Sequence, residues 1–175
     1  MVQVNIELED YNPNWPKIYL IEKEKLQDIL VQDLITIHHI GSTAIPNIKA
    51  KPIIDILCVV KNIKDIDRYH SAMERLGYEG LGENGISSRR FFLKRNKNTQ
   101  KRTHHVHIFD QSAYGQIERH LDFRDYLREN PKEARNYEVL KEKLAQRYPE
   151  NRDKYTEGKE AFIKEIERKA NIYFN

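Results

Sequence analysis

Apolar residues in the first third of the chain follow one helical pattern and two strand patterns. Between Pro13 and Asp33 they recur at spacings of three, four and seven, which is typical of a helix with one buried stripe. The stretch from Ile35 to Ile40 has the pattern of a short strand that ends at Gly41. The unbroken apolar run from Ile53 to Val60 predicts a buried strand at the centre of a sheet.

The middle of the chain predicts a second helix and three more strands. Apolar positions at helical spacing run from Ile63 to Leu76, and Gly77 lies where a left-handed residue would end that helix. Strand patterns follow near Tyr78, over Arg90 to Lys94 and over Thr103 to Phe109. The loop between the last two is polar and basic, so we interpret it as a solvated hairpin turn. Contact of this loop with a phosphate or a nucleic acid is the alternative.

From Tyr114 onward the pattern is helical to the end of the chain. Asn130 and Pro131 separate two of these helices, and with Glu133 they resemble a capping box at the start of the second. A last helix carries Phe162. These helices are expected to pack on the sheet.

Together these elements predict the α/β (α+β) class, with a mixed sheet flanked by helices and with C-terminal helices packed on it. We expect one domain over residues 1–175, with a core at about 13–112 and the C-terminal helices at about 114–173. The composition agrees with this expectation, because 39% hydrophobic and 33% charged residues are typical of a water-soluble globular protein.

Charge and cysteine content narrow the classes of function. The net charge of +3 is too small to drive nucleic-acid binding by bulk electrostatics, so nucleic acid is not the expected partner. Cys58 is the single cysteine, which excludes an intramolecular disulfide and favours a reducing compartment. The sequence has neither a leader-like start nor a run of about 18 apolar residues, so we expect a cytoplasmic protein without membrane contact.

The turn Gly41-Ser42-Thr43 is a candidate phosphate-binding turn at the end of a strand. A strand that ends in Gly-Ser leaves backbone N–H groups free, and the hydroxyls of Ser42 and Thr43 add groups that suit a phosphate. The glycine permits close approach of a ligand. A plain turn is the alternative, because Gly-Ser occurs by chance in many proteins.

Asp55 is the one charged residue in the central strand pattern. A buried carboxylate is costly unless it is hydrogen-bonded, paired with a cation or bound to a metal ion. An ion pair with Lys51, Arg89 or Arg90 would satisfy it without any function. Because Asp55 follows the Gly-Ser turn, we interpret it as a functional residue.

His105 and His107 lie two residues apart in a strand pattern, so their imidazoles project from the same face. This arrangement suits a metal ion or a phosphate, and hydrogen-bonded surface histidines would show the same spacing. Arg90 supplies a guanidinium that suits a phosphate or a carboxylate, with an ordinary strand-end charge as the alternative.

The segments from His39 to Pro46 and from Ala50 to Ile56 closely resemble the signature of the GrpB family, and the likeness extends over nearly the whole chain. Further stretches also look like blocks of that family: Gly77-Tyr78, Arg90-Phe91-Phe92, His105-Val106-His107 and Leu121 to Arg128. One departure is Asn47, where the family usually has glycine. Asparagine tolerates a left-handed backbone, so we expect the turn to persist.

The resemblance implies a nucleotidyltransferase-like fold of the polymerase-β-like superfamily. Active members follow a Gly-Ser turn with Asp-x-Asp and a third carboxylate, which hold two divalent cations. Here Asp55 resembles the second Asp, Ile53 stands at the first position, and His105 and His107 stand where the third carboxylate would be. Mg²⁺ favours oxygen ligands, so a site with two Mg²⁺ ions is not expected. One Asp and two His suit Zn²⁺ or Mn²⁺, or the imidazoles contact a phosphate directly.

The candidate site therefore has two groups of residues. The catalytic residues, which are also the candidate ligands of a divalent Zn, Mn or Mg ion, are Asp55, His105 and His107, and the ligand-binding residues are Gly41, Ser42, Thr43, Lys51 and Arg90. One hypothesis is nucleotidyl transfer. The other is a module that binds a nucleotide-like or coenzyme A-related metabolite without turnover, which Ile53 favours. An RNA-associated protein that uses the basic hairpin is a weaker third possibility.

Overall fold

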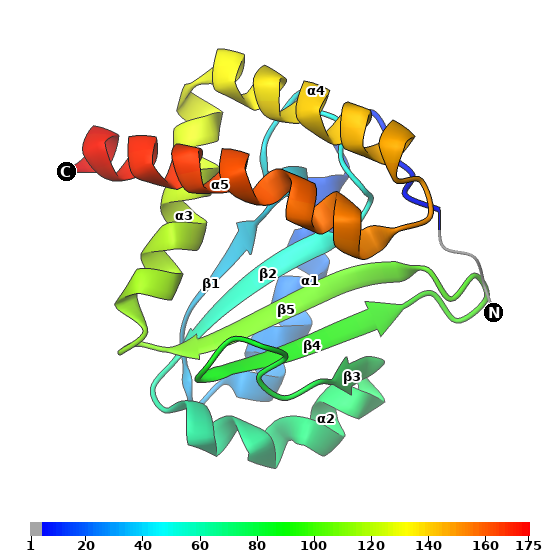
Figure 1. Cartoon of the computed structure of the whole chain (residues 1–175). Coiled ribbons are helices and arrows are strands. Elements are labelled where there is room, and N and C mark those ends of the chain that lie inside the picture. Colours follow the sequence, from blue (N-terminus) through cyan, green and yellow to red (C-terminus); the bar gives the residue numbers. More distant parts are fainter. Residues whose placement is uncertain (1–4) are drawn as a thin grey trace.

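A five-stranded mixed sheet forms the middle layer of the protein, with helices on both faces (Figure 1). The computed structural model describes residues 5–175. The strand order is β1-β2-β5-β4-β3, and within this part of the chain only β2 and β5 pair in parallel. The predicted fold class, a mixed sheet flanked by helices, is confirmed.

The strands lie close to their predicted positions. They span Leu34–Ile40 (β1), Ile54–Val60 (β2), Tyr78–Gly80 (β3), Arg89–Arg95 (β4) and Arg102–Asp110 (β5). The parallel register of the central pair places Asp55 beside His105 and Leu57 beside His107. The sheet therefore brings together two segments that lie fifty residues apart.

The helices also agree with the apolar pattern, with one difference. They span Trp15–Leu30 (α1), His70–Arg75 (α2), Tyr114–Glu129 (α3), Pro131–Arg147 (α4) and Arg152–Phe174 (α5), with 3₁₀ segments at Ser42–Ala44 (η1) and Ile63–Tyr69 (η2). The first half of the predicted helix from Ile63 to Leu76 is thus a 3₁₀ helix, since Asp65 and Asp67 are poor α-helix formers. None of the helices within residues 5–175 combines the length and the apolar character that a bilayer crossing requires.

The larger core lies between the sheet and the layer of α1, η2 and α2. Leu26 and Leu30 of α1 pack with Ile56, Val106 and Ile108 of the central strands, and all five are completely buried. Each such side chain contributes about 1.5–3 kcal/mol through burial. Alternate residues of β2 and β5 face this core, so the residues between them face the opposite side of the sheet.

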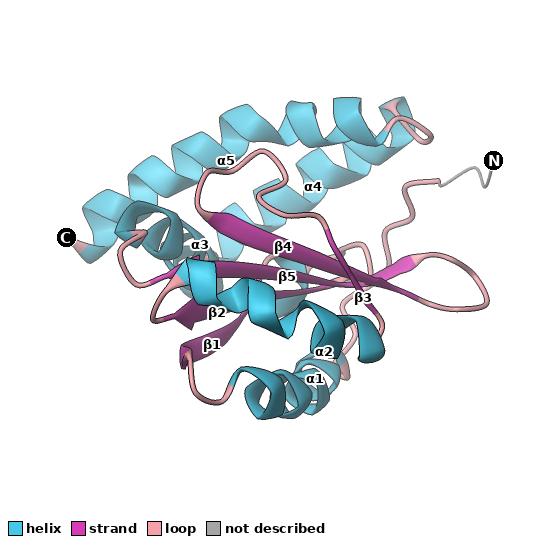
Figure 2. Cartoon of the chain, turned by 90° about the horizontal axis from the view of Figure 1, so that it is seen from below, coloured by secondary structure: helices cyan, strands magenta, loops and turns pink. Residues whose placement is uncertain are grey.

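The opposite face of the sheet is covered by the C-terminal helices, as Figure 2 shows. Leu57 and Phe109 pack there against Ile117 and Leu121 of α3. A further cluster joins the three C-terminal helices to the loop after η1, through residues that include Ile45, Ile48, Leu127, Tyr137 and Ile166. The loop that follows the Gly-Ser turn is thus built into the helical layer.

The start of α4 differs from the predicted capping box. The Asn130 side chain makes no cap bond and donates instead to the Tyr126 carbonyl at 2.8 Å. The carboxylate of Glu133 pairs with Lys169 of α5 at 2.6 Å. The expected cap was wrong because tertiary partners from α3 and α5 take up both side chains.

Candidate functional site

Asp55 lies on the face of β2 that is turned toward the C-terminal helices. Its neighbours Ile54 and Ile56 point into the core beneath α1, so the alternation of the strand turns Asp55 to the opposite face. The backbone pairs it with Ile40 on β1 and with His105 on β5. The Asp55 side chain is 27% exposed, so it is partly open to solvent.

Two imidazoles from β5 hold this carboxylate. His105 Nδ1 lies 3.3 Å from Asp55 Oδ1, and His107 Nε2 lies 3.4 Å from the same oxygen. Val106 between them points into the core beneath α1, which confirms that the two imidazoles share one face. Among residues 5–175 no lysine or arginine makes the alternative direct ion pair with Asp55, so the partners of this half-buried acid are histidines.

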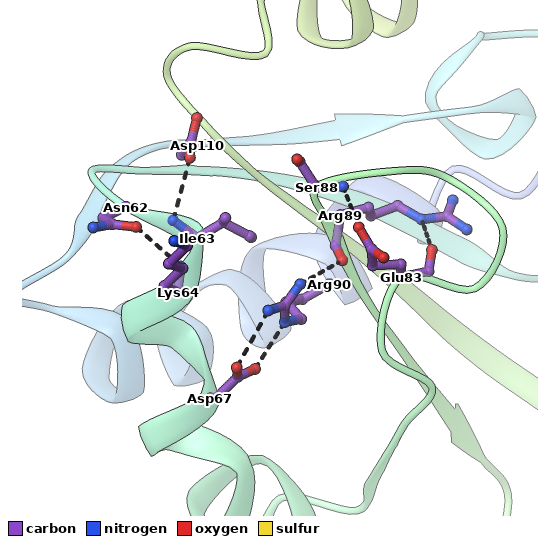
Figure 3. A network of polar contacts seen from close by, with 9 residues as sticks. All are labelled: Asn62, Ile63, Lys64, Asp67, Glu83, Ser88, Arg89, Arg90 and Asp110. Atoms are coloured by element: carbon purple, nitrogen blue, oxygen red, sulfur yellow. Dashed lines mark hydrogen bonds and ion pairs between the residues drawn. The ribbon is translucent and has the colours of Figure 1, made fainter.

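Arg89 determines which nitrogen of His107 carries the proton. Its Nη1 lies 3.3 Å from His107 Nδ1, and a guanidinium has only donors. His107 Nδ1 must therefore accept, so a neutral His107 carries its proton on Nε2 and donates it to Asp55. The carbonyls of Glu83 and Asn84 hold the other arms of Arg89 at 3.1 and 2.8 Å, the first of which is drawn in Figure 3.

The imidazoles stabilise the ionised form of Asp55. Burial alone would raise the pKa of Asp55, but the hydrogen bonds and charges of His105 and His107 bring that pKa well below its usual range. Burial lowers the pKa of His105 against the opposing effect of Asp55. Near pH 7 the centre is therefore an ionised Asp55 beside a neutral His105. Because His105 Nδ1 donates to Asp55, its Nε2 keeps a lone pair, and this buried atom has no partner in the described chain.

Gly41 brings the Gly-Ser turn into contact with Asp55. Its φ of 73° and ψ of −171° lie in a region that is essentially reserved for glycine. A Cβ at this position would lie 2.7 Å from Asp55 Oδ2. Ser42 lies next along the turn, beside Tyr137 of α4: burial raises the pKa of Tyr137 to about 12, and a hydrogen bond with Ser42 opposes that rise. The structure thus brings Gly41 together with Asp55 and places the Ser42 side chain against Tyr137.

Thr43 faces the interior of the turn. Its hydroxyl donates to the Ile53 carbonyl at 3.1 Å and lies 2.9 Å from His39 Nε2. Burial lowers the pKa of His39 to about 4, so that ring is neutral and donates to Thr43. Because these two partners engage the buried Thr43 hydroxyl, the structure does not bring it to Asp55 as a free phosphate ligand.

Two arginines of α3 hold the ends of the same turn. Arg124 Nη1 donates to the His39 carbonyl at 3.1 Å, and Arg128 Nε donates to the Ala44 carbonyl at 2.8 Å. The sequence patterns did not single them out. Their spacing of four on one helix face was the available signal.

Arg90 lies on the face of the sheet opposite Asp55, where Figure 3 shows it beside Asp67 of η2. Its guanidinium binds both carboxylate oxygens of Asp67 in η2, at 2.7 and 3.2 Å. The structure therefore does not bring Arg90 to Asp55, and Arg89 takes the place beside His107. The strand period of two separates these neighbours, but only the observed register shows which of them faces the site.

Three cations interact electrostatically with Asp55, one from the segment before β2 and two from α5. Lys51 precedes β2, and Arg152 and Lys159 belong to α5. All three are half-buried, yet no carboxylate oxygen of residues 5–175 lies within 4.0 Å of them. The amino groups of Lys51 and Lys159 lie 5.1 and 4.6 Å from the centre of the Tyr155 ring. We call Lys51, Arg152 and Lys159 the cation triplet.

Sequence reasoning found Lys51 but missed the two members on α5. Arg152, Tyr155 and Lys159 lie at positions i, i+3 and i+7, so they share one helix face. That spacing was the signal that could have identified them. Charged residues with this spacing also occur on ordinary solvated helix faces, so the pattern alone did not point to Asp55.

Burial and mutual repulsion oppose the protonation of these cations. Burial first, and then the charges of Lys159 and Arg152, lower the pKa of Lys51 to about 7. Burial likewise lowers the pKa values of Lys159 and Arg152. Lys141 of α4 lies nearby, and burial together with the charges of Lys159 and Lys51 lowers its pKa to about 7. An anion is the chemical complement of this surface.

The residues present do not fit a divalent metal ion. In residues 5–175 no group of three His, Cys, Asp or Glu side chains is arranged to hold one. Asp55 is the one carboxylate at the centre, and the cation triplet opposes a further positive charge beside it. The expected metal ligands Asp55, His105 and His107 do lie together, but both histidines are engaged with the Asp55 carboxylate.

The fold and the site define an α+β protein whose sheet carries an acid–imidazole centre beneath cationic C-terminal helices. Residues 5–169 match the family model described as GrpB protein. The chain belongs to the GrpB family, which confirms the resemblance seen in the sequence.

Relatives of known sequence and structure agree with this assignment. The crystal structure of conserved protein GrpB from Enterococcus faecalis matches with a TM-score of 0.90 at 45% identity, over 97% of this chain and 100% of that one. UPF0157 protein YqkA of Bacillus subtilis is 46% identical over 94% of this chain and 47% of its own length. Glutamate-rich protein GrpB of Alkalihalophilus pseudofirmus is 35% identical over 91% of this chain and 92% of its own length. The chain thus spans about half the length of the Bacillus relative.

We expect Gly41→Ala to destabilise the protein by about 2–3 kcal/mol, because it combines backbone strain with a clash against Asp55. Gly85→Ala is the matched control, since Gly85 has a φ of 86° and no atom lies within 4 Å of the place that the new methyl group would take. The control carries strain alone and should cost about 1–2 kcal/mol. Urea unfolding measures both variants, and equal losses would contradict the contact between residue 41 and Asp55.

We expect His107 to carry its proton on Nε2 in nitrogen-15 NMR spectra of the imidazole ring. Arg89→Met removes the donor to Nδ1, so the two tautomers should mix in that variant. Arg89→Lys keeps a donor and should retain more of the Nε2 tautomer. A wild-type His107 with its proton on Nδ1 would rule out the proposed hydrogen-bond directions.

Proposed function

We propose that the protein binds a phosphate-containing small molecule, of the nucleotide or coenzyme A type, between β2 and α5. The observation that carries this proposal is the cation triplet, whose members have no carboxylate partner within 4.0 Å in the described chain. Half-buried cations are costly unless they are matched, and phosphate oxygens match lysine and arginine well. Ser42 adds a hydroxyl on the turn beside Asp55.

Asp55 has a different role from the cations, because a carboxylate repels a phosphate. Its Oδ1 is engaged by His105 and His107, whereas Oδ2 lies against Gly41. A partly exposed, ionised oxygen accepts hydrogen bonds, so it suits a hydroxyl of the ligand. A molecule that offers both phosphate and sugar hydroxyls, as nucleotides and coenzyme A do, satisfies both parts of the site.

Nucleotidyl transfer is the second candidate function. The contact between Gly41 and Asp55 favours it, because the family resemblance implies a Gly-Ser turn beside a catalytic carboxylate. Ile53, at the position of the first Asp, supplies no oxygen for a metal ion. Binding without turnover is therefore the function that the geometry supports better.

We place this binding protein in the cytoplasm. Cys58 is completely buried, and burial raises the pKa of its thiol to about 12, so it acts as an apolar core residue. A single inert thiol suits a reducing compartment.

We expect AMP or coenzyme A to raise the melting temperature in the presence of EDTA, since ligand at a hundredfold excess over its Kd adds about 2.7 kcal/mol. Lys51→Met should weaken this binding at least ~10-fold by removing a charge-assisted contact. The same variant should stabilise the free protein by about 1 kcal/mol, because it removes an unmatched half-buried charge.

Lys164→Met is the control, because Lys164 is an exposed lysine of α5, the helix that carries Arg152 and Lys159. This variant should leave both the stability and the binding close to wild type. Two outcomes speak against the proposal: the Lys51 and Lys164 variants behave alike, or no phosphate compound changes the melting temperature.

We expect the free protein to become more stable as the pH rises from about 7 to about 8.5, a range in which the buried Cys58 and the buried tyrosines stay mostly protonated in both states. The folded pKa of Lys51, about 7, lies below the unfolded value of 10.5, so the unfolded chain binds more protons in this window. Lys51 faces Lys159, Arg152 and Asp55, and its partial exposure limits the expected gain to about 1 kcal/mol. Urea unfolding at pH 7 and at about pH 8.5 measures it, and Lys51→Met should show a smaller gain. Equal gains in the wild type and in Lys51→Met would contradict the lowered pKa of Lys51.

A further inference from the structure

The charge of the cation triplet restricts the kind of phosphate that the site accepts. This inference rests on the proposed function, the binding of a phosphate-containing molecule. The three members of the triplet face Asp55 alone, so two positive charges lack a counterion once Lys51, whose pKa is about 7, takes up its proton in the complex. The hydrogen bonds that Asp55 accepts come from His105 and His107, so it makes no direct ion pair with the triplet. The ligand has to supply the missing negative charge.

The surroundings of the triplet do not supply that charge. Besides the other members of the triplet, Lys51 feels the positive charge of Arg102, and Arg152 feels that of Arg95. The one further acid that acts on Arg152 is Asp153, which has no oxygen within 4.0 Å of any cation in the described chain. The residues around the triplet therefore add positive charge to the site.

The donors of the triplet also match a particular number of phosphate oxygens. A terminal phosphate has three unesterified oxygens and a charge between about −1.5 and −2 at pH 7, whereas a diester has two such oxygens and one charge. The two ammonium groups on the Tyr155 ring and the guanidinium of Arg152 provide three separate groups of donors. A terminal phosphate occupies all three, and an internal diester leaves one of them unmatched.

We propose that the site selects a doubly charged terminal phosphate, either a phosphomonoester or a diphosphate end, over an internal phosphodiester, and that it takes this group in its metal-free form. Mg²⁺ bound to the ligand would cancel the charge that the triplet requires and would find one protein carboxylate, Asp55, nearby. The backbone of a nucleic acid, which consists of singly charged diesters, is excluded on the same grounds.

A pair of ligands with the same base and sugar tests the selection. AMP carries a monoester, whereas the methyl ester of its 5′-phosphate carries a diester and keeps both ribose hydroxyls. In titration calorimetry at pH 7.5 with EDTA, AMP should bind at least ~10-fold more tightly, and excess Mg²⁺ should weaken its binding. Inorganic pyrophosphate against dimethyl phosphate repeats the comparison without any base or sugar, so its result does not depend on which nucleoside the protein prefers.

Variants connect the selection to the triplet. Lys159→Met should reduce the preference for the monoester and for pyrophosphate several-fold, whereas Lys164→Met on the exposed face of α5 should keep it. Equal affinity for monoester and diester, or tighter binding with Mg²⁺, overturns this inference and leaves the proposed phosphate binding intact. Failure of AMP, coenzyme A and pyrophosphate alike to bind overturns both.

Discussion

The site depends on the hydrogen bonds that place an ionised Asp55 inside a sheet. One oxygen of this carboxylate faces both His105 and His107, and those contacts offset the cost of burying it. The arrangement requires β2 and β5 to be parallel neighbours in the observed register, because a slip of one residue would turn the imidazoles to the core beneath α1. The same pairing that forms the centre of the fold therefore forms the centre of the site.

The two halves of the chain contribute different chemistry to this centre. The sheet supplies the acid, the imidazoles and the Gly41 turn, while α5 supplies Arg152 and Lys159. The loop after the turn packs into the core of the C-terminal helices through Ile45 and Ile48. The packing of α3, α4 and α5 against the sheet therefore determines where the positive charge lies relative to Asp55.

Local patterns were enough to predict the elements, the buried acid and the shared face of His105 and His107. They failed where a property depends on tertiary pairing. The side chain of Thr43 bonds to His39 and that of Arg90 to Asp67, and no local sequence pattern predicts either partner. The contribution of α5 was missed for the same reason, since about a hundred residues separate Lys51 from Arg152 and Lys159 along the chain.

The unmatched cations lower the free energy of unfolding of the free protein. A fold free to optimise its stability would pair Lys51 with a carboxylate or replace it with an apolar residue, yet the burial and the repulsion persist. The pKa of Lys51, at about 7, means that a bound anion favours the protonated amine and draws a proton to it. Binding of an anion and protonation of Lys51 therefore favour each other, and both depend on the packing of α5, which supplies Arg152 and Lys159. In the proposed complex, the ionised Asp55 places a negative charge beside the cations, so the two ends of a ligand meet opposite charges and its orientation is defined.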